Sequence, residues 1–183
     1  MTKRARLEAV RGDITRQRVF AFVIPATSSR LGGGGGAGAI HAAAGPALLA
    51  ECEELRRTIL PGGLPVGQAV TTGAGDLPCR WVVHTVGPNR HAGQTDPALL
   101  ARCFETSLAE AVRVGARSVA LPAVSAGIYG WDVRDVARIA AASIVPSPHR
   151  ARLELVRFVL FNPEAHMAFE QALQDAGSER PEP

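Results

Sequence analysis

Two glycine-rich segments are the places where this chain could do chemistry. The first, residues 25–38, reads Pro-Ala-Thr-Ser-Ser-Arg-Leu, then five consecutive glycines, then Ala37 and Gly38. The second, residues 125–130, reads Ser-Ala-Gly-Ile-Tyr-Gly. Because each glycine loses extra backbone entropy on folding, such runs indicate positive φ angles or backbone that closely approaches a ligand. Both segments precede a predicted helix, and the free N–H groups at a helix N-terminus favour an anion.

The elements that must position these loops alternate between strand and helix. The continuous apolar run at 19–24, before the first loop, predicts a buried strand, and residues 118–122, before the second loop, predict another strand. Further strands are expected at 5–11, at a sheet edge, and at 67–72, 81–86 and 153–161; helices are expected from Ala39 to the Pro-Gly-Gly at 61–63 with a break near 45–46, and at 97–114, 132–145 and 163–176. This order predicts one α/β domain over residues 1–176, with a mostly parallel sheet between helices, and a flexible tail at 177–183.

Ligands of such sheets bind beyond the carboxyl ends of the strands, where both glycine loops fall, so the two loops could hold a diphosphate from both sides. For either loop alone, a simple flexible turn is the alternative. A Rossmann dinucleotide site is another, because Gly33, Gly35 and Gly38 satisfy G-x-G-x-x-G. The Rossmann interpretation ranks second, because the acidic residues about 20 positions on fall inside a predicted helix rather than at a strand end. In addition, about seven residues separate Ile24 from Gly32.

The composition limits the function classes. The 183 residues include 46% hydrophobic residues, which suits one compact domain with a core. With 20 basic and 17 acidic residues the net charge is +3, and the arginines are scattered among few aromatics, so nucleic-acid binding gains no support. Three cysteines are too few for a disulfide framework or a cysteine-based zinc site. The small number of cysteines fits a reducing cytoplasm. Since there is no apolar run of about 18 residues, we expect no membrane segment. We also expect no metal and no cofactor.

Several short motifs carry a family resemblance through their order and spacing. They are Gly-Asp-Ile-Thr at 12–15, the segment from Ser-Ser to Gly-Ala-Ile-His at 28–41, Ala-Ala-Gly-Pro at 43–46, Leu-Pro at 77–78, Val-His-Thr-Val-Gly-Pro at 83–88, Leu-Pro-Ala-Val-Ser-Ala-Gly-Ile-Tyr-Gly at 121–130 and Arg-Phe-Val-Leu-Phe at 157–161. Over nearly its whole length the chain resembles a macrodomain, closest to the branch of ADP-ribose-binding proteins that hydrolyse mono-ADP-ribose from modified proteins. The resemblance implies a three-layer α/β/α fold with a central mixed, mostly parallel sheet.

The resemblance also implies which residues form the pocket. Asp13 and the backbone of Ile14 would recognise the adenine, Phe161 would lie against its ring, and Tyr129 would close over the distal ribose. The full set implied for ligand binding is Asp13, Ile14, Ala26, Thr27, Gly34, Gly35, Gly36, Ala37, Gly38, Pro88, Ser125, Ala126, Gly127, Ile128, Tyr129, Phe161 and Asn162. Without the resemblance, Asp13 is expected to cap a turn and Phe161 to lie in the core.

Two histidines in the motifs have no metal-ligand spacing with a third residue. His84 falls inside an apolar predicted strand, which is typical of a hydrogen-bonded core histidine. His41 falls in the first turn of a predicted helix, where a structural role is favoured and catalysis is the alternative.

The chain departs from the family pattern at two positions tied to catalysis. Hydrolases of this branch usually read Val-Asn-Ala-Ala-Asn before the Ser-Ser pair and have an Asp before Gly-Ala-Ile-His; here the sequence reads Val-Ile-Pro-Ala-Thr at 23–27 and has Ala37. The water-activating carboxylate of the family is therefore absent. A positioned general base contributes about 10²–10⁴-fold in rate, so its loss need not abolish hydrolysis. A phosphate oxygen of the substrate could orient the attacking water, and Thr27 could hydrogen-bond a ribose hydroxyl.

These observations favour a hydrolase that removes mono-ADP-ribose, or a related O-linked ADP-ribosyl ester, through a variant site. Its candidate catalytic residues are Thr27, Tyr129 and Asp132, although Asp132 is also placed to cap the helix that follows it. Its partners would be ADP-ribose and a mono-ADP-ribosylated protein, with nucleic acid only as a modified substrate. The alternative is a non-catalytic ADP-ribose reader with the same pocket.

Overall fold

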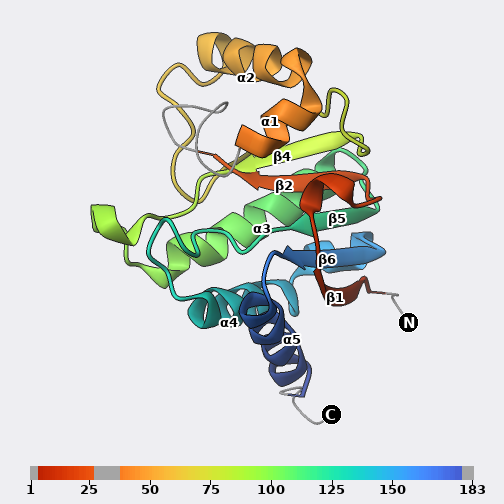
Figure 1. Ribbon diagram of the computed structural model, residues 1–183, viewed down its shortest axis with the longest axis vertical. Coiled ribbons are helices and arrows are strands. Elements are labelled where there is room, and N and C mark those ends of the chain that lie inside the picture. Colours follow the sequence, from red (N-terminus) through yellow and green to blue (C-terminus); the bar gives the residue numbers. More distant parts are fainter. Residues whose placement is uncertain (1–3, 27–37, 179–183) are drawn as a thin grey trace.

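The computed structural model describes residues 4–26 and 38–178 (Figure 1). Within them, six strands form one sheet in the order β1-β6-β5-β2-β4-β3. The strands are β1 (Arg6–Arg11), β2 (Ala21–Pro25), β3 (Ala69–Gly73), β4 (Trp81–Thr85), β5 (Ser118–Leu121) and β6 (Leu155–Leu160). All neighbours pair in parallel except β3, which is antiparallel to β4. The predicted mixed, mostly parallel sheet is confirmed, with β1 at an edge as expected.

Helices cover both faces of the sheet (Figure 1). One face carries α1 (Gly38–Ala44) and α2 (Pro46–Thr58), and the other carries α3 (Pro97–Arg113), α4 (Val133–Ile144) and α5 (Pro163–Ser178). Short 3₁₀ helices lie at η1 (Ile14–Arg16), η3 (Arg90–Ala92) and η4 (Pro148–Arg152). The three-layer α/β/α architecture is therefore confirmed.

The strand β2 shows how the sequence fixes these layers. Its neighbours β5 and β4 cover both of its edges, and residues 21–24 are fully buried. Because side chains alternate along a strand, Phe22 and Ile24 pack with α1 and α2, whereas Ala21 and Val23 pack with the three helices opposite. A continuous apolar run is what a strand buried on both faces requires.

Two expected helix boundaries can be compared with the structure. The break after α1 is confirmed: Gly45 has φ of 79°, a left-handed value that suits glycine, and Pro46 begins α2. The end expected at residue 176 is wrong by two residues, because α5 continues through Gly177 to Ser178. Glycine in a helix costs only about 1 kcal/mol relative to alanine, so it does not stop one by itself. The rest of the expected tail, residues 179–183, lies outside the described residues.

Candidate functional site

The candidate site lies at the carboxyl edge of the sheet. Strands β1, β6, β5, β2 and β4 run parallel, so their carboxyl ends meet at one edge. The residues expected to bind the ligand follow these ends: Asp13 after β1, Ala26 after β2, Pro88 after β4, residues 125–129 after β5, and Phe161 and Asn162 after β6. Of the other expected residues, Gly38 begins α1, whereas Thr27 and residues 34–37 lie outside the described part of the chain.

The second glycine loop is a hydrogen-bonded turn with its tip exposed. Gly127 and Gly130 have φ of 78° and 79°, which explains why glycine stands at both positions. The Gly130 N–H donates to the Gly127 carbonyl at 2.8 Å and closes the turn. Ile128, at the tip, is 77% exposed. Within the described residues the N–H groups of Gly127, Ile128 and Tyr129 donate to no protein acceptor, so they are available to an anion.

Ser125 carries the strain of this loop. With φ of 69°, Ser125 has a left-handed backbone, as no other non-glycine residue among the described residues does. This conformation costs about 1–3 kcal/mol and occurs mostly at functional sites. The side chain is buried against Gly87, and its hydroxyl has no hydrogen-bond partner among residues 4–26 and 38–178. A Cβ atom on Gly87 would lie 2.2 Å from Ser125 Oγ, so only glycine lets the segment after β4 pack here.

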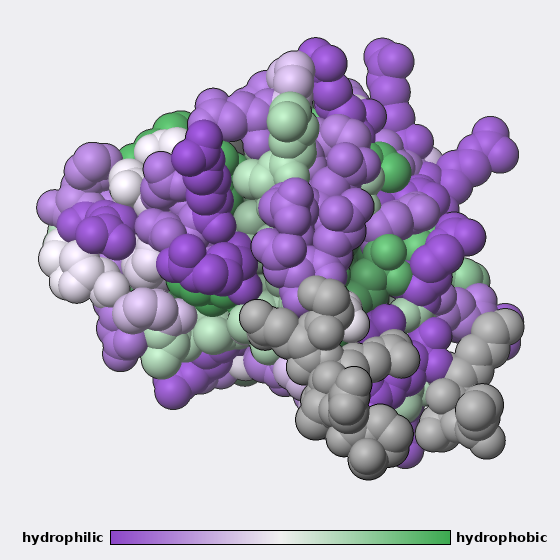
Figure 2. Space-filling model, turned by 90° about the horizontal axis from the view of Figure 1, so that it is seen from below, coloured by the Kyte–Doolittle hydropathy of each residue, from purple (hydrophilic) through white to green (hydrophobic). Residues whose placement is uncertain are grey.

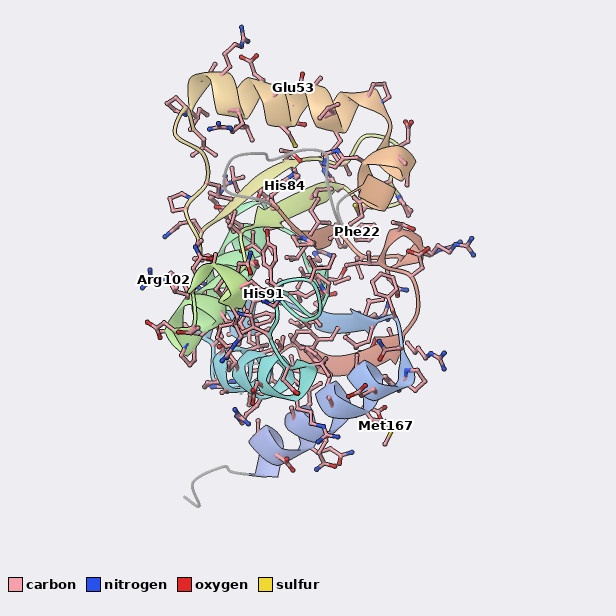
Figure 3. All side chains as sticks on the ribbon, turned by 60° about the vertical axis from the view of Figure 1, so that its left-hand side comes forward. Phe22, Glu53, His84, His91, Arg102 and Met167 are labelled. Carbon is pink, nitrogen blue, oxygen red and sulfur yellow. The ribbon has the colours of Figure 1, made fainter. Side chains whose placement is uncertain are left out.

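The segment from Pro88 to η3 braces the second loop. Trp131 Nε1 donates to the Pro88 carbonyl at 3.0 Å, and the Arg90 N–H donates to the Tyr129 carbonyl at 2.9 Å. The Arg90 guanidinium lies 5.0 Å from the Trp131 ring centroid, a cation–π distance. The ring of His91, labelled in Figure 3, lies against Gly130, where a Cβ atom would be 2.8 Å from His91 Nε2. None of Arg90, His91 and Trp131 is among the residues predicted from the sequence, because no local pattern reveals contacts across about 40 residues.

Asp13 is held at the other end of the site. Asp13 Oδ1 accepts from Thr15 Oγ1 at 2.7 Å and from the Thr15 N–H at 2.9 Å, which confirms the turn-capping interpretation. These hydrogen bonds, the hydroxyl one first, lower the pKa of the Asp13 carboxyl, so the group is ionised at neutral pH. Its side chain remains half exposed, with Oδ2 3.9 Å from Arg16 Nε. The cap therefore uses one oxygen and leaves an oriented carboxylate facing solvent. Ile14, beside it, is buried in the cluster under α1.

Phe161 lies near Asp13 because β1 and β6 are neighbours. The Gly12 N–H donates to the Leu160 carbonyl at 2.9 Å, so the two strands separate only after this point. Phe161 is 78% exposed, and the interpretation that places it in the core is wrong. Asn162 Oδ1 accepts from the Ala165 N–H at 2.8 Å and thereby caps the first turn of α5. An exposed aromatic ring and an oriented carboxylate thus follow the ends of neighbouring strands.

Asp132 has the helix-capping role that the sequence offered as its alternative. Asp132 Oδ1 accepts from the Arg134 N–H at 2.8 Å, and Asp132 is the N-cap of α4. A cap in this geometry contributes about 1 kcal/mol to helix stability. This hydrogen bond accounts for the acidic residue after the second loop.

His84 is a buried, hydrogen-bonded core residue, as expected. Its Nε2 lies 2.8 Å from Thr72 Oγ1 and 3.8 Å from Cys52 Sγ, beneath α2 (Figure 3). Burial, together with the nearby His41, lowers the pKa of His84 to about 3, so its ring is neutral at physiological pH. Over the described ranges, no three His, Cys, Asp or Glu side chains gather in a way that could hold a metal ion.

A hollow of about 1130 Å³ lies elsewhere, between α4 and α5. It shares no residue with the strand-end site. The candidate site is defined by the residues that follow the carboxyl ends of the strands, and not by this hollow.

A mostly parallel sheet between two layers of helices is an α/β fold, and comparisons with known proteins specify its family. The Macro domain family model matches residues 23–140, and the chain belongs to the Macro domain family. It is 52% identical to a Streptomyces griseus macro domain-containing protein, covering 90% of this chain and 92% of the other. It is 43% identical to the O-acetyl-ADP-ribose deacetylase of Klebsiella pneumoniae, covering 91% and 95%.

A solved structure has the same fold. The Oceanobacillus iheyensis macrodomain with ADP superimposes with a TM-score of 0.90 at 35% identity, covering 98% of this chain and 96% of the other. In the described residues, no helix is both long and apolar enough to cross a membrane.

Proposed function

We propose that the protein binds ADP-ribose at the carboxyl edge of the sheet and hydrolyses O-linked ADP-ribosyl esters there. The substrates would be O-acetyl-ADP-ribose and mono-ADP-ribose carried by a protein. The observation that carries the proposal is the convergence of Asp13, Phe161 and the second glycine loop on one sheet edge. The likeness to a relative named O-acetyl-ADP-ribose deacetylase supports it.

The adenine would bind between β1 and β6. The Asp13 carboxylate accepts from the exocyclic amine, the backbone of Ile14 contacts the same edge of the base, and the base stacks on Phe161. The exposure of both side chains supports this assignment, because neither is consumed by the core.

The diphosphate would bind between the two glycine loops. Free backbone N–H groups at Gly127, Ile128 and Tyr129 donate to its oxygens from one side, and residues 34–38 with Ala26 are assigned to the other. Tyr129, whose carbonyl is held by the Arg90 N–H, then covers the distal ribose. Pro88 and Ser125 would support the loop from behind, Pro88 by accepting a hydrogen bond from Trp131 and Ser125 by packing against Gly87.

Hydrolysis would proceed without a protein carboxylate at position 37. In the acetyl ester, water adds to the acyl carbon, the bond from that carbon to the ribose oxygen breaks, the ribose oxygen takes up the proton from the water to become a hydroxyl, and acetate leaves. In the protein-linked ester, the bond from the anomeric carbon to the ester oxygen breaks with oxocarbenium character, the protein carboxylate leaves, and water adds to the anomeric carbon and loses a proton. In both, a phosphate oxygen of the substrate orients the water, and Thr27 and Tyr129 hold the ribose, so positioning supplies most of the acceleration. Asp132 remains the cap of α4.

The test is a time course of ADP-ribose release from O-acetyl-ADP-ribose and from a mono-ADP-ribosylated protein. We expect release well beyond one equivalent, abolished in Gly35→Glu, which puts a carboxylate where the diphosphate binds. Gly62→Glu, at an exposed turn with no atom near its Cβ position, is the matched control and should keep full turnover. Turnover retained in Gly35→Glu would contradict the site. Tight ADP-ribose binding without release from either substrate would support the non-catalytic reader, which the Ala37 departure favours.

A further inference from the structure

The hollow between α4 and α5 is a groove on the outer surface of the helix layer, and the proposed function does not use it. Small side chains form its floor, among them Ala141, Ala168 and Ala172. Figure 2, which views the molecule from the α4 and α5 end, shows an apolar strip bounded by hydrophilic groups. Beside the floor stands Met167, 67% exposed and pointing away from α5 (Figure 3). The face therefore presents both an apolar projection and an apolar hollow.

The two walls of the groove carry opposite charges. The α4 wall presents Arg134 and Arg138, and Arg138 is oriented by an ion pair with Asp135 at 2.7 Å. Arg4 and Arg150 also line the hollow, so arginines outnumber acidic residues in it. The α5 wall presents Glu164 and Asp175, and α5 has no Lys or Arg from Pro163 to Ser178. A peptide of a single charge sign would be attracted by one wall and repelled by the other.

We propose that this face binds a second copy of the chain in a two-fold dimer, with α4 of each protomer against α5 of its partner. The two helices follow the parallel strands β5 and β6 over the same face, so they run in the same direction. A two-fold axis along them sets each α4 opposite the other protomer's α5 with the helix ends level. Arg134 then lies level with the partner's Glu164 near the N-terminal ends of the two helices, and the same contact occurs twice, as isologous symmetry requires.

Shape complements charge in this arrangement. The contact buries each Met167 in the alanine-lined floor of the other protomer, where small side chains allow a close approach of helices. The same surface thus supplies the projection, the hollow and both charge signs. A second copy is the occupant that fits all four features.

Charge reversal tests the proposal by sedimentation velocity on the full-length protein, from low to high micromolar concentration. The first variant, Arg134→Glu with Arg138→Glu, makes both walls acidic; the second, Glu164→Arg with Asp175→Arg, makes both basic. We expect the unmodified protein to dimerise and each variant alone to dimerise at least about tenfold more weakly. A 1:1 mixture of the two should form a heterodimer, because both contacts then pair opposite charges. Heterodimer formation also demonstrates that both variants are folded.

A pair of apolar substitutions gives an independent measurement. Met167→Ala should weaken the dimer severalfold, whereas Ile59→Ala should leave it unchanged. Ile59 is the matched control because it is 71% exposed at the end of α2, on the opposite face of the sheet. The proposal is overturned if the unmodified protein stays monomeric throughout the range. It is equally overturned if the charge variants self-associate as tightly as the unmodified protein, or if folded variants fail to pair.

Discussion

The two described ends of the candidate site are built in different ways. At the proposed adenine end, Asp13 is fixed by Thr15, which is two residues away, and Phe161 is exposed where the neighbouring strand β6 ends. At the second glycine loop, positive φ angles and contacts across about 40 residues fix the backbone, from Pro88 to Trp131 and from Arg90 to Tyr129. One end offers side chains and the other offers peptide groups.

This difference predicts how each end recognises its part of the ligand. A base is distinguished by the pattern of donors and acceptors on its edge, which a single oriented carboxylate and an aromatic face can read. A diphosphate has oxygens on every side, and several peptide N–H groups can surround it without any particular side chain. At the proposed adenine end, substitutions should therefore weaken binding when they remove a side chain. At the loop, they should weaken function when they add an atom that displaces the backbone.

The largest effect is expected where an added atom displaces the loop. Gly87→Ala puts a Cβ atom 2.2 Å from Ser125 Oγ and 2.8 Å from Val124 Cγ1, so the loop must move. A displacement of about 1 Å at a reacting centre can cost about 10²-fold in rate, and we expect ester turnover to fall by that order. Steady-state kinetics with O-acetyl-ADP-ribose measure it. Gly62→Ala, with no atom within 4 Å of its Cβ position, should behave as the unmodified protein, and equal rates for both variants would refute the bracing role of Gly87.

A smaller effect is expected from removing the adenine-end carboxylate. Asp13→Ala should weaken ADP-ribose binding by about 1.5–3 kcal/mol, the value of a charge-assisted hydrogen bond, as measured by titration calorimetry. The variant also loses a turn cap, so the control must lose one too. Asp96→Ala does, because Asp96 Oδ1 caps α3 by accepting from the Ala98 N–H at 2.9 Å. Both variants should lose about 1 kcal/mol of stability, and only Asp13→Ala should lose affinity. Equal affinities would assign Asp13 to capping alone.

The sequence predicted the order of the elements, which the structure confirms. This worked because runs such as residues 19–24 are buried on both faces and leave little freedom in strand position. The turn cap at Asp13 was predicted and is confirmed, and the same side chain also presents an exposed carboxylate. The end of α5 was misplaced because a single glycine weighs little against the packing of a helix on the sheet.

The bracing contacts of the second loop could not be predicted from the sequence. Gly87 follows β4 and is separated from Ser125 by all of α3 and β5, so nothing in its local pattern indicates that a methyl group would collide there. Arg90 and His91 likewise look like ordinary surface residues, and their contacts with Trp131 and Gly130 exist only once β2 pairs with both β4 and β5. Local periodicity indicates which face of an element a residue occupies, but it does not indicate which distant residue that residue will contact.

The smallest effect is expected at Phe161, and it distinguishes stacking from folding. Because the ring is 78% exposed, Phe161→Ala should leave the unfolding free energy nearly unchanged. Stacking of a base on an aromatic side chain contributes about 1–3 kcal/mol, so ADP-ribose affinity should fall by about tenfold, and Phe161→Tyr should restore it. Phe20→Ala is the control, since Phe20 is also exposed, at 43%, but precedes β2 at the opposite edge of the sheet. Ribose 5-phosphate has no base, so Phe161→Ala should leave its affinity unchanged. If the substitution weakens ribose 5-phosphate binding as much as ADP-ribose binding, adenine does not stack on Phe161 and binds elsewhere on the sheet edge.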